Sequence, residues 1–141
     1  TTTTQVSPLE TWRLENFTTN ASVPSLGGNG ADPDGDGIPN LAEFYFALKP
    51  VAPDASAANF PAAFMDGDGP HVRFTRTQAS WPAVLVCEFS TDLATWNSGT
   101  FGLDYDHFAV TPNGDGTETV TFRLLPDESA RFVRLRVTTS E

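Results

Sequence analysis

Apolar residues follow two different spacings along this chain, a helical spacing before residue 50 and an alternating spacing after residue 70. The first predicts an amphipathic helix over 41–48 that ends before Pro50. Its apolar residues, at i, i+3, i+4 and i+7, are Leu41, Phe44, Tyr45 and Leu48.

An earlier helix is predicted from Pro8 to about Phe17. Ser7 is suited to cap it, and proline is favoured at the first helical position. Leu9, Trp12 and Phe17 fall near one face, so we expect this helix to dock on the rest of the protein. Residues 18–31 are rich in Gly, Ser, Thr and Asn without an apolar period, and predict a loop.

The second half of the chain carries the alternation typical of half-buried β-strands. Val, Phe and Thr are frequent there, and the sequence NGDG at 113–116 is typical of a hairpin turn. One or two further strands are expected near 101–108. The five clear strands are the segments 71–77, 83–90, 108–112, 117–125 and 131–137.

One face of these strands is apolar and the other polar, as Val120 and Phe122 against Thr119, Thr121 and Arg123 illustrate. Strands at this spacing without intervening helices favour an antiparallel sandwich. We therefore predict a mainly β fold, an antiparallel β-sandwich with a small N-terminal helical appendage. Its parts are a linker tail at 1–6, a helical and loop segment at 7–50, a connector at 51–70 and the sandwich at 71–141.

Composition narrows the class of protein. The 141 residues include 39% hydrophobic residues and carry a formal charge of −10, so the chain is expected to fold but lacks the basic surface that nucleic acid requires. No apolar run reaches the length of a membrane helix. Cys87 is the single cysteine, which rules out an intramolecular disulfide, and its apolar neighbours predict a buried thiol.

The segment DPDGDGIPNLAE, residues 32–43, has the spacing of an EF-hand-type loop. Such loops take ligands from positions 1, 3, 5, 7, 9 and 12 and have a glycine at position 6, which is Gly37 here. The carbonyl oxygen serves at position 7. The predicted ligands are Asp32, Asp34, Asp36, Ile38, Asn40 and Glu43.

Four carboxylates this close repel one another unless a hard cation lies among them. A cage of six or seven oxygens suits Ca²⁺ better than Mg²⁺, and zinc would require His or Cys. The alternative is a solvated Asp/Gly turn. A Gly-rich loop replaces the entering helix of a true EF-hand, and only one such loop is present, so we expect a structural ion rather than a sensor.

DPDGDGIPN resembles the calcium loops of thrombospondin type 3 repeats and, less closely, of dockerins. The wider pattern of this loop, the later STDLATW and the closing RFVRLRV is similar to C-terminal modules of large secreted proteins from planctomycete and verrucomicrobial bacteria. That resemblance implies an extracellular, non-catalytic accessory module next to polysaccharide-active or adhesive domains. Cohesin binding is not expected, since dockerins carry two such loops.

Two other acidic segments allow a functional interpretation beside a structural one. Asp66, Asp68 and His71 could form a second ion site, although a turn before a strand is the simpler interpretation. Asp104 and Asp106 would share one side of a strand, as paired carboxylates of a glycosidase could, but two carboxylates at this spacing on an exposed strand are usually solvated acid. We expect no catalysis.

Exposed aromatic side chains would suit a sugar ligand, because pyranose faces stack on them. Trp81, Trp96 and Tyr105 lie in or near the irregular segments between strands, where each could hold a glycan or fix a loop on the sandwich. A carbohydrate-binding module and a surface-anchoring or protein-interaction module are thus the alternatives to a plain calcium-stabilised module. In each case we expect a monomer at or outside the cell surface, joined to other domains of a parent chain.

Overall fold

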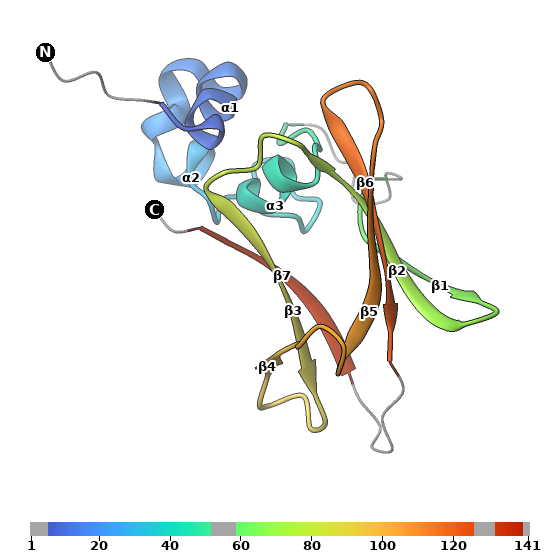
Figure 1. The fold of residues 1–141 in the computed structure, drawn as a ribbon. Helices are drawn as coiled ribbons and strands as arrows, with labels where there is room; N and C mark the ends of the chain where they lie inside the picture. The colour runs from blue at the N-terminus through green and yellow to red at the C-terminus, as the bar shows by residue number, and fades with distance from the viewer. Residues whose placement is uncertain (1–5, 52–58, 126–131, 140–141) are drawn as a thin grey trace, which may run out of the picture.

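A computed structural model describes residues 6–51, 59–125 and 132–139, in which two antiparallel sheets lie below a group of short helices. The four-stranded sheet has the strand order β1-β2-β6-β5, and the three-stranded sheet has the order β4-β3-β7 (Figure 1). The chain is therefore mainly β, a sandwich with a small helical part, as the alternating spacing predicted.

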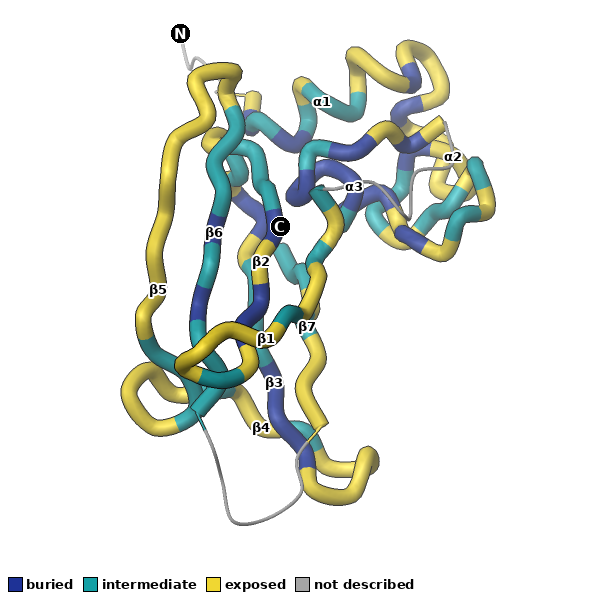
Figure 2. Tube along the Cα trace, turned by 90° about the vertical axis from the view of Figure 1, so that its right-hand side faces the viewer, coloured by how far each residue is buried: buried dark blue, intermediate teal, exposed yellow. Residues whose placement is uncertain are grey.

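The four-stranded sheet turns one face inward, where Val72 and Phe74 of β2 meet Val120 and Phe122 of β6 in the core. The tube in Figure 2 shows these buried segments on β2 and β6, while β5 is exposed over most of its length. The NGDG segment joins β5 to β6, as predicted. The strands are β1 (Ala62–Asp66), β2 (Gly69–Thr77), β5 (Tyr105–Pro112) and β6 (Thr117–Leu124).

The three-stranded sheet pairs β3 (Ala83–Ser90) with β7 (Phe132–Thr139) along their whole lengths, and with the two-residue β4 (Asn97–Ser98) at one end. Leu85, Cys87, Leu135 and Val137 pack against the core from its inner face. Cys87 is only half-buried, which corrects the prediction of a buried thiol.

The helices close one end of the sandwich. Leu9 of α1 is completely buried, and Trp12 makes edge contacts with Phe17 and with Phe44 of α3, so α1 docks as its apolar face predicted. No helix in the described segments is long and apolar enough to cross a membrane. The helices are α1 (Pro8–Phe17), the 3₁₀ helix η1 (Thr18–Ser22), α2 (Pro24–Gly27) and α3 (Asn40–Tyr45).

The structure also corrects three predictions about helices and strands. The segment 18–31 is not all loop, because η1 and α2 occupy most of 18–27. Strand β1 lies inside 51–70, where only a connector was expected. The third helix begins at Asn40 and ends at Tyr45 rather than Leu48.

A left-handed turn ends α3 early. Ala47 has a φ of 55°, and the Leu48 amide donates to the Glu43 carbonyl while the Ala47 amide donates to the Phe44 carbonyl. These two bonds define a Schellman motif, which usually has glycine where Ala47 stands. Leu48 stays buried beyond the helix end, which explains why the apolar spacing overstates the helix length.

Candidate metal site

The predicted ion loop runs from Asp32 into the first turn of α3. Gly35 and Gly37 have φ values of 69° and 88°, a left-handed conformation that glycine adopts without steric cost. Gly37 is the sharp-turn glycine that the sequence pattern assigned to position 6. The chain therefore folds back on itself between the aspartates, as an ion loop requires.

Main-chain amides hold one oxygen of each aspartate. The Gly37 amide donates to Asp32 Oδ2 at 2.9 Å, the Asp36 amide to Asp34 Oδ1 at 3.2 Å, and the Ile38 amide to Asp36 Oδ1 at 2.9 Å. These bonds fix the orientation of the three carboxylates before any ion binds. The Ile38 carbonyl stays a predicted ligand.

Four carboxylates meet at this loop. Asp32, Asp34, Asp36 and Glu43 each present an oxygen, and all four oxygens lie within 4.8 Å of one another. Asp32 Oδ1 and Asp34 Oδ2 are shielded from solvent and receive no hydrogen bond from the described residues. Burial is the main cause of a raised pKa at Asp34, and the charge of Asp36 adds to it. The site is thus rich in negative charge and short of donors.

Glu43 is fully buried, with 0% of its surface exposed. It lies in the first turn of α3, where a negative charge is favoured by the helix dipole. A glutamate this deep requires compensation by a positive charge or by protonation. Because Glu43 is at position 12 of the loop, a cation bound there would supply the positive charge.

Asn40 has a second role that the sequence did not reveal. Its side chain is 1% exposed, and its Nδ2 donates to the carbonyls of Leu26 and Gly28 at 2.7 and 2.9 Å. Both amide hydrogens are therefore used to hold the Gly-rich segment. Asn40 Oδ1 is buried and receives no bond within the described ranges, as expected for a ligand atom.

Arg13 of α1 also holds the Gly-rich segment, and no sequence spacing pointed to it. Its Nε donates to the Gly27 carbonyl at 2.8 Å, and its guanidinium also contacts Asn29 Oδ1 and Glu10. The Leu41 amide donates to the Asn29 carbonyl. Helix α1, the Gly-rich segment and the ion loop are thereby linked.

Chemically, the donor set consists of oxygens alone. Four carboxylates in so small a volume fit a hard divalent cation. Such an ion would coordinate Asp32 Oδ1 and Asp34 Oδ2, which receive no hydrogen bond within the described segments. The residues therefore fit the predicted Ca²⁺.

The segment with Asp66, Asp68 and His71 forms the turn that was the simpler interpretation, and the alternative ion site does not assemble. Over the described part of the chain, the cluster at Asp32 is the only one in which three or more His, Cys, Asp or Glu side chains could share a metal. His71 instead stacks on Phe64, with its Nδ1 2.9 Å from the Gly69 carbonyl. Asp66 ends β1 and Asp68 lies on the turn between β1 and β2, and both are exposed.

Asp104 and Asp106 have separate structural roles. Asp104 accepts from the Thr100 amide at 2.8 Å, whereas Asp106 forms a two-pronged ion pair with Arg123 at 2.7 and 2.6 Å. The hydrogen bonds from Arg123 hold the pKa of Asp106 below its ordinary value. Asp106 is therefore unsuited to act as a general acid.

The three tentative ligand aromatics differ in exposure. Trp81 is 62% exposed, ahead of β3. Trp96 is half-buried with the Arg134 guanidinium 4.2 Å from its ring centre, and Tyr105 is half-buried against Phe122. Only Trp81 of the three presents a largely free ring.

Comparison with known proteins gave no match, either to a protein family, to a curated protein or to a solved structure.

Proposed function

We propose that residues 32–43 bind one Ca²⁺ whose role is structural. The observation that carries this proposal is the pair of buried oxygens, Asp32 Oδ1 and Asp34 Oδ2, which receive no hydrogen bond from the residues that the structure describes and belong to the same cluster as the buried Glu43. Leaving such charges unpaired in a folded protein is costly. A divalent cation removes that cost.

Calcium is favoured over magnesium because several carboxylates approach from different directions. Mg²⁺ demands a near-ideal octahedron and keeps several of its waters, whereas Ca²⁺ accepts six to eight oxygens in flexible geometry. Glu43, at position 12, is placed to bind through both oxygens.

The structural role follows from what the ion loop touches. Glu43 and Asn40 begin α3, and Phe44 and Tyr45 of the same helix belong to the main core. An ion held by this loop would therefore fix α3 in the end of the sandwich, and through Asn40 the Gly-rich segment as well.

Replacing one ligand tests this role. Asp34→Ala should remove most of the rise in melting temperature that calcium gives the wild type. Asp68→Ala is the matched control, because Asp68 lies in a similar Asp-Gly sequence on an exposed turn. If Asp34→Ala melts like the wild type in excess calcium, the site is not the one proposed.

We further propose that the chain is a non-catalytic accessory module of a larger secreted or cell-surface protein. Support comes from the resemblance of the calcium loop and from the abundance of calcium outside cells. Extracellular modules bind calcium with dissociation constants of about 10⁻⁴–10⁻³ M. Calorimetric titration measures that constant, and a value below about 10⁻⁷ M, typical of cytosolic buffers, would argue against this location.

Polysaccharide binding is a second candidate function, favoured by the exposed ring of Trp81. Migration through a gel containing polysaccharide should be retarded for the wild type and restored by Trp81→Ala. Tyr105→Ala is a poorer probe because Tyr105 packs on Phe122, so its loss would also affect stability.

A further inference from the structure

Strand β7 has a free edge within the described structure. The Cys87 carbonyl of β3 accepts from the Gly99 amide on the β4 side, so the main-chain groups of Glu88 and Val86 point the other way, to Arg134 and Arg136 of β7. By the same alternation, the N–H and C=O groups of Leu135 and Val137 point away from β3. These groups form a row at the edge of the sheet that no other strand of the described segments pairs with.

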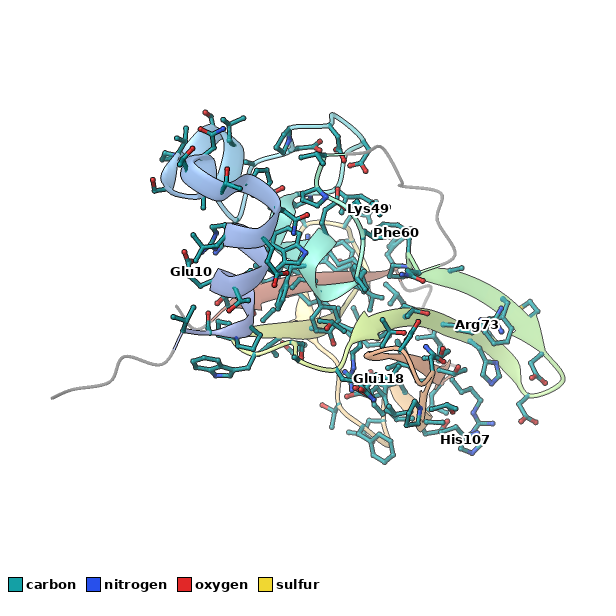
Figure 3. All side chains as sticks on the ribbon, turned by 90° about the horizontal axis from the view of Figure 1, so that it is seen from above. Glu10, Lys49, Phe60, Arg73, His107 and Glu118 are labelled. Carbon is teal, nitrogen blue, oxygen red and sulfur yellow. The ribbon has the colours of Figure 1, made fainter. Side chains whose placement is uncertain are left out.

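A groove of about 560 Å³ runs along this edge. One wall is the ion loop and α3, and the other is the segment before β1, where Figure 3 shows Phe60 beside α3. Leu135, Arg136 and Val137 line its β7 side. The apolar side chains of its two walls are Ile38, Pro39, Leu41, Phe46, Phe60 and Pro61.

The other long edge strand, β5, is better protected against pairing than β7, whose protective features are the charges of Arg134 and Arg136. Strand β5 has an irregular register between Asp106 and Ala109 and ends in Pro112, features that prevent the addition of a further strand. Over Leu135–Val137 the register of β7 is regular and contains no proline. This edge is therefore open to another strand.

The groove lining defines the chemistry of its occupant. Among the described residues that line it, none is acidic and only Arg136 is charged, with its guanidinium on Glu88 and Nε 3.0 Å from Oε1. The lining therefore complements uncharged, apolar side chains, while the edge of β7 requires main-chain donors and acceptors.

We propose that this groove binds an extended apolar segment of a partner polypeptide, which adds a strand to β7. The partner's main chain pairs with Leu135 and Val137, and its alternate side chains enter the groove, the arrangement known as β-augmentation. This inference rests on the proposed function in one respect, since Gly37–Pro39 of the calcium loop form part of the wall. Binding should therefore weaken when calcium is removed.

Gly30 gives a sharp test because it lines the groove and a Cβ added there meets nothing within 4 Å. A leucine at this position can extend into the groove without displacing the backbone. Gly67, on the turn between β1 and β2, has equally free space and does not line the groove. Gly30→Leu and Gly67→Leu are therefore matched variants, and equal melting temperatures would show that both fold.

The experiment selects a display library of random nonapeptides on the calcium-loaded protein and measures binding of the enriched peptides in synthetic form. We expect apolar residues at alternate positions, affinity reduced about tenfold or more by Gly30→Leu, and affinity unchanged by Gly67→Leu. N-methylation of alternate amides should abolish binding, while N-methylation of the intervening amides should not.

Failure to enrich any peptide, equal binding to Gly30→Leu, or indifference to N-methylation would overturn the proposal. Melting curves recorded with calcium and with a chelator distinguish a failure of the groove proposal from a failure of the calcium proposal. Peptides that meet the Gly30 and N-methylation criteria while calcium leaves the melting temperature unchanged would support the groove and reject the ion. A calcium-dependent melt without peptide binding would do the reverse.

Discussion

Asp32 and Glu43, at positions 1 and 12 of one loop, bring carboxylate oxygens to within 4.8 Å of each other from a turn and from a helix. Without an ion, these two charges oppose the fold of residues 32–43. With an ion between them, the same two residues close the loop onto α3. The stability of the helical end of the protein should therefore depend on the cation.

Glu43→Gln should separate the repulsion between the carboxylates from the binding of calcium. Loss of one negative charge relieves repulsion, so the metal-free variant should melt at a higher temperature than the metal-free wild type. Calcium affinity should fall by at least about tenfold, and a tenfold loss corresponds to about 1.4 kcal/mol of binding free energy. Melting curves in chelator and in calcium measure both. A variant less stable than the wild type in chelator would show that Glu43 does not experience net repulsion.

Asn40→Ala should destabilise the protein with and without calcium, because the carbonyls of Leu26 and Gly28 lose the buried side-chain amide that donates to them. The expected loss is about 1–3 kcal/mol, because each of the two hydrogen bonds contributes about 0.5–1.5 kcal/mol net. Urea unfolding in chelator isolates this part of the effect. An unchanged midpoint in chelator would mean that the Gly-rich segment does not depend on Asn40.

Ala47→Gly should stabilise the protein. Ala47 has a left-handed φ of 55° at the end of α3, where an L side chain costs about 1–2 kcal/mol and glycine costs less. The greater freedom of glycine in the unfolded chain offsets part of this gain. A net rise of about 0.5–1 kcal/mol is expected in urea unfolding, whereas a loss would indicate that α3 does not end in this turn.

Gly27→Ala should be destabilising because the added Cβ would lie 2.3 Å from the Ala21 carbonyl oxygen. That atom belongs to the backbone of η1 and cannot move freely, so a cost of about 1–3 kcal/mol is expected from overpacking. Gly30→Ala is the control, since its Cβ has free space. Equal unfolding midpoints of the two variants would contradict the packing of α2 on η1.

Acid should weaken the three-stranded sheet through Glu88. Hydrogen bonds from Arg136 and Arg134 lower the pKa of Glu88 below its ordinary value of 4.5. Because the pKa is lowered on folding, the ionised Glu88 adds to the free energy of unfolding above pH 4.5. This stabilisation is lost as the pH falls through the folded-state pKa. In chelator, Glu88→Gln should therefore lose less stability than the wild type between pH 5 and pH 3. A steeper loss in the variant would reverse the assigned shift.

Strands with one buried face could be predicted from the sequence, as Val120 and Phe122 show. Strand β1 could not, because it lies at an edge, most of its residues are exposed, and its pairing is to β2 alone. Short helices were also missed. Helix α2 is held by tertiary bonds such as that from Arg13 to the Gly27 carbonyl, which no local spacing encodes.

The candidate metal site, too, could be predicted from the sequence only in part. Ligand spacing is local, so Asp32, Asp34, Asp36 and Glu43 could be named from the sequence. The second role of Asn40 depends on the carbonyls of Leu26 and Gly28, which only the fold brings to it. The groove beside β7 joins segments from three parts of the chain, so it too required the structure.

The most direct test of the calcium site is a thermal melt of the metal-stripped protein titrated with calcium and, in parallel, with magnesium. The structure predicts a midpoint that rises with calcium, since an ion that binds only the folded state stabilises it by mass action, and that hardly moves with magnesium. A midpoint that neither ion shifts would contradict the site and leave residues 32–43 as an acidic turn.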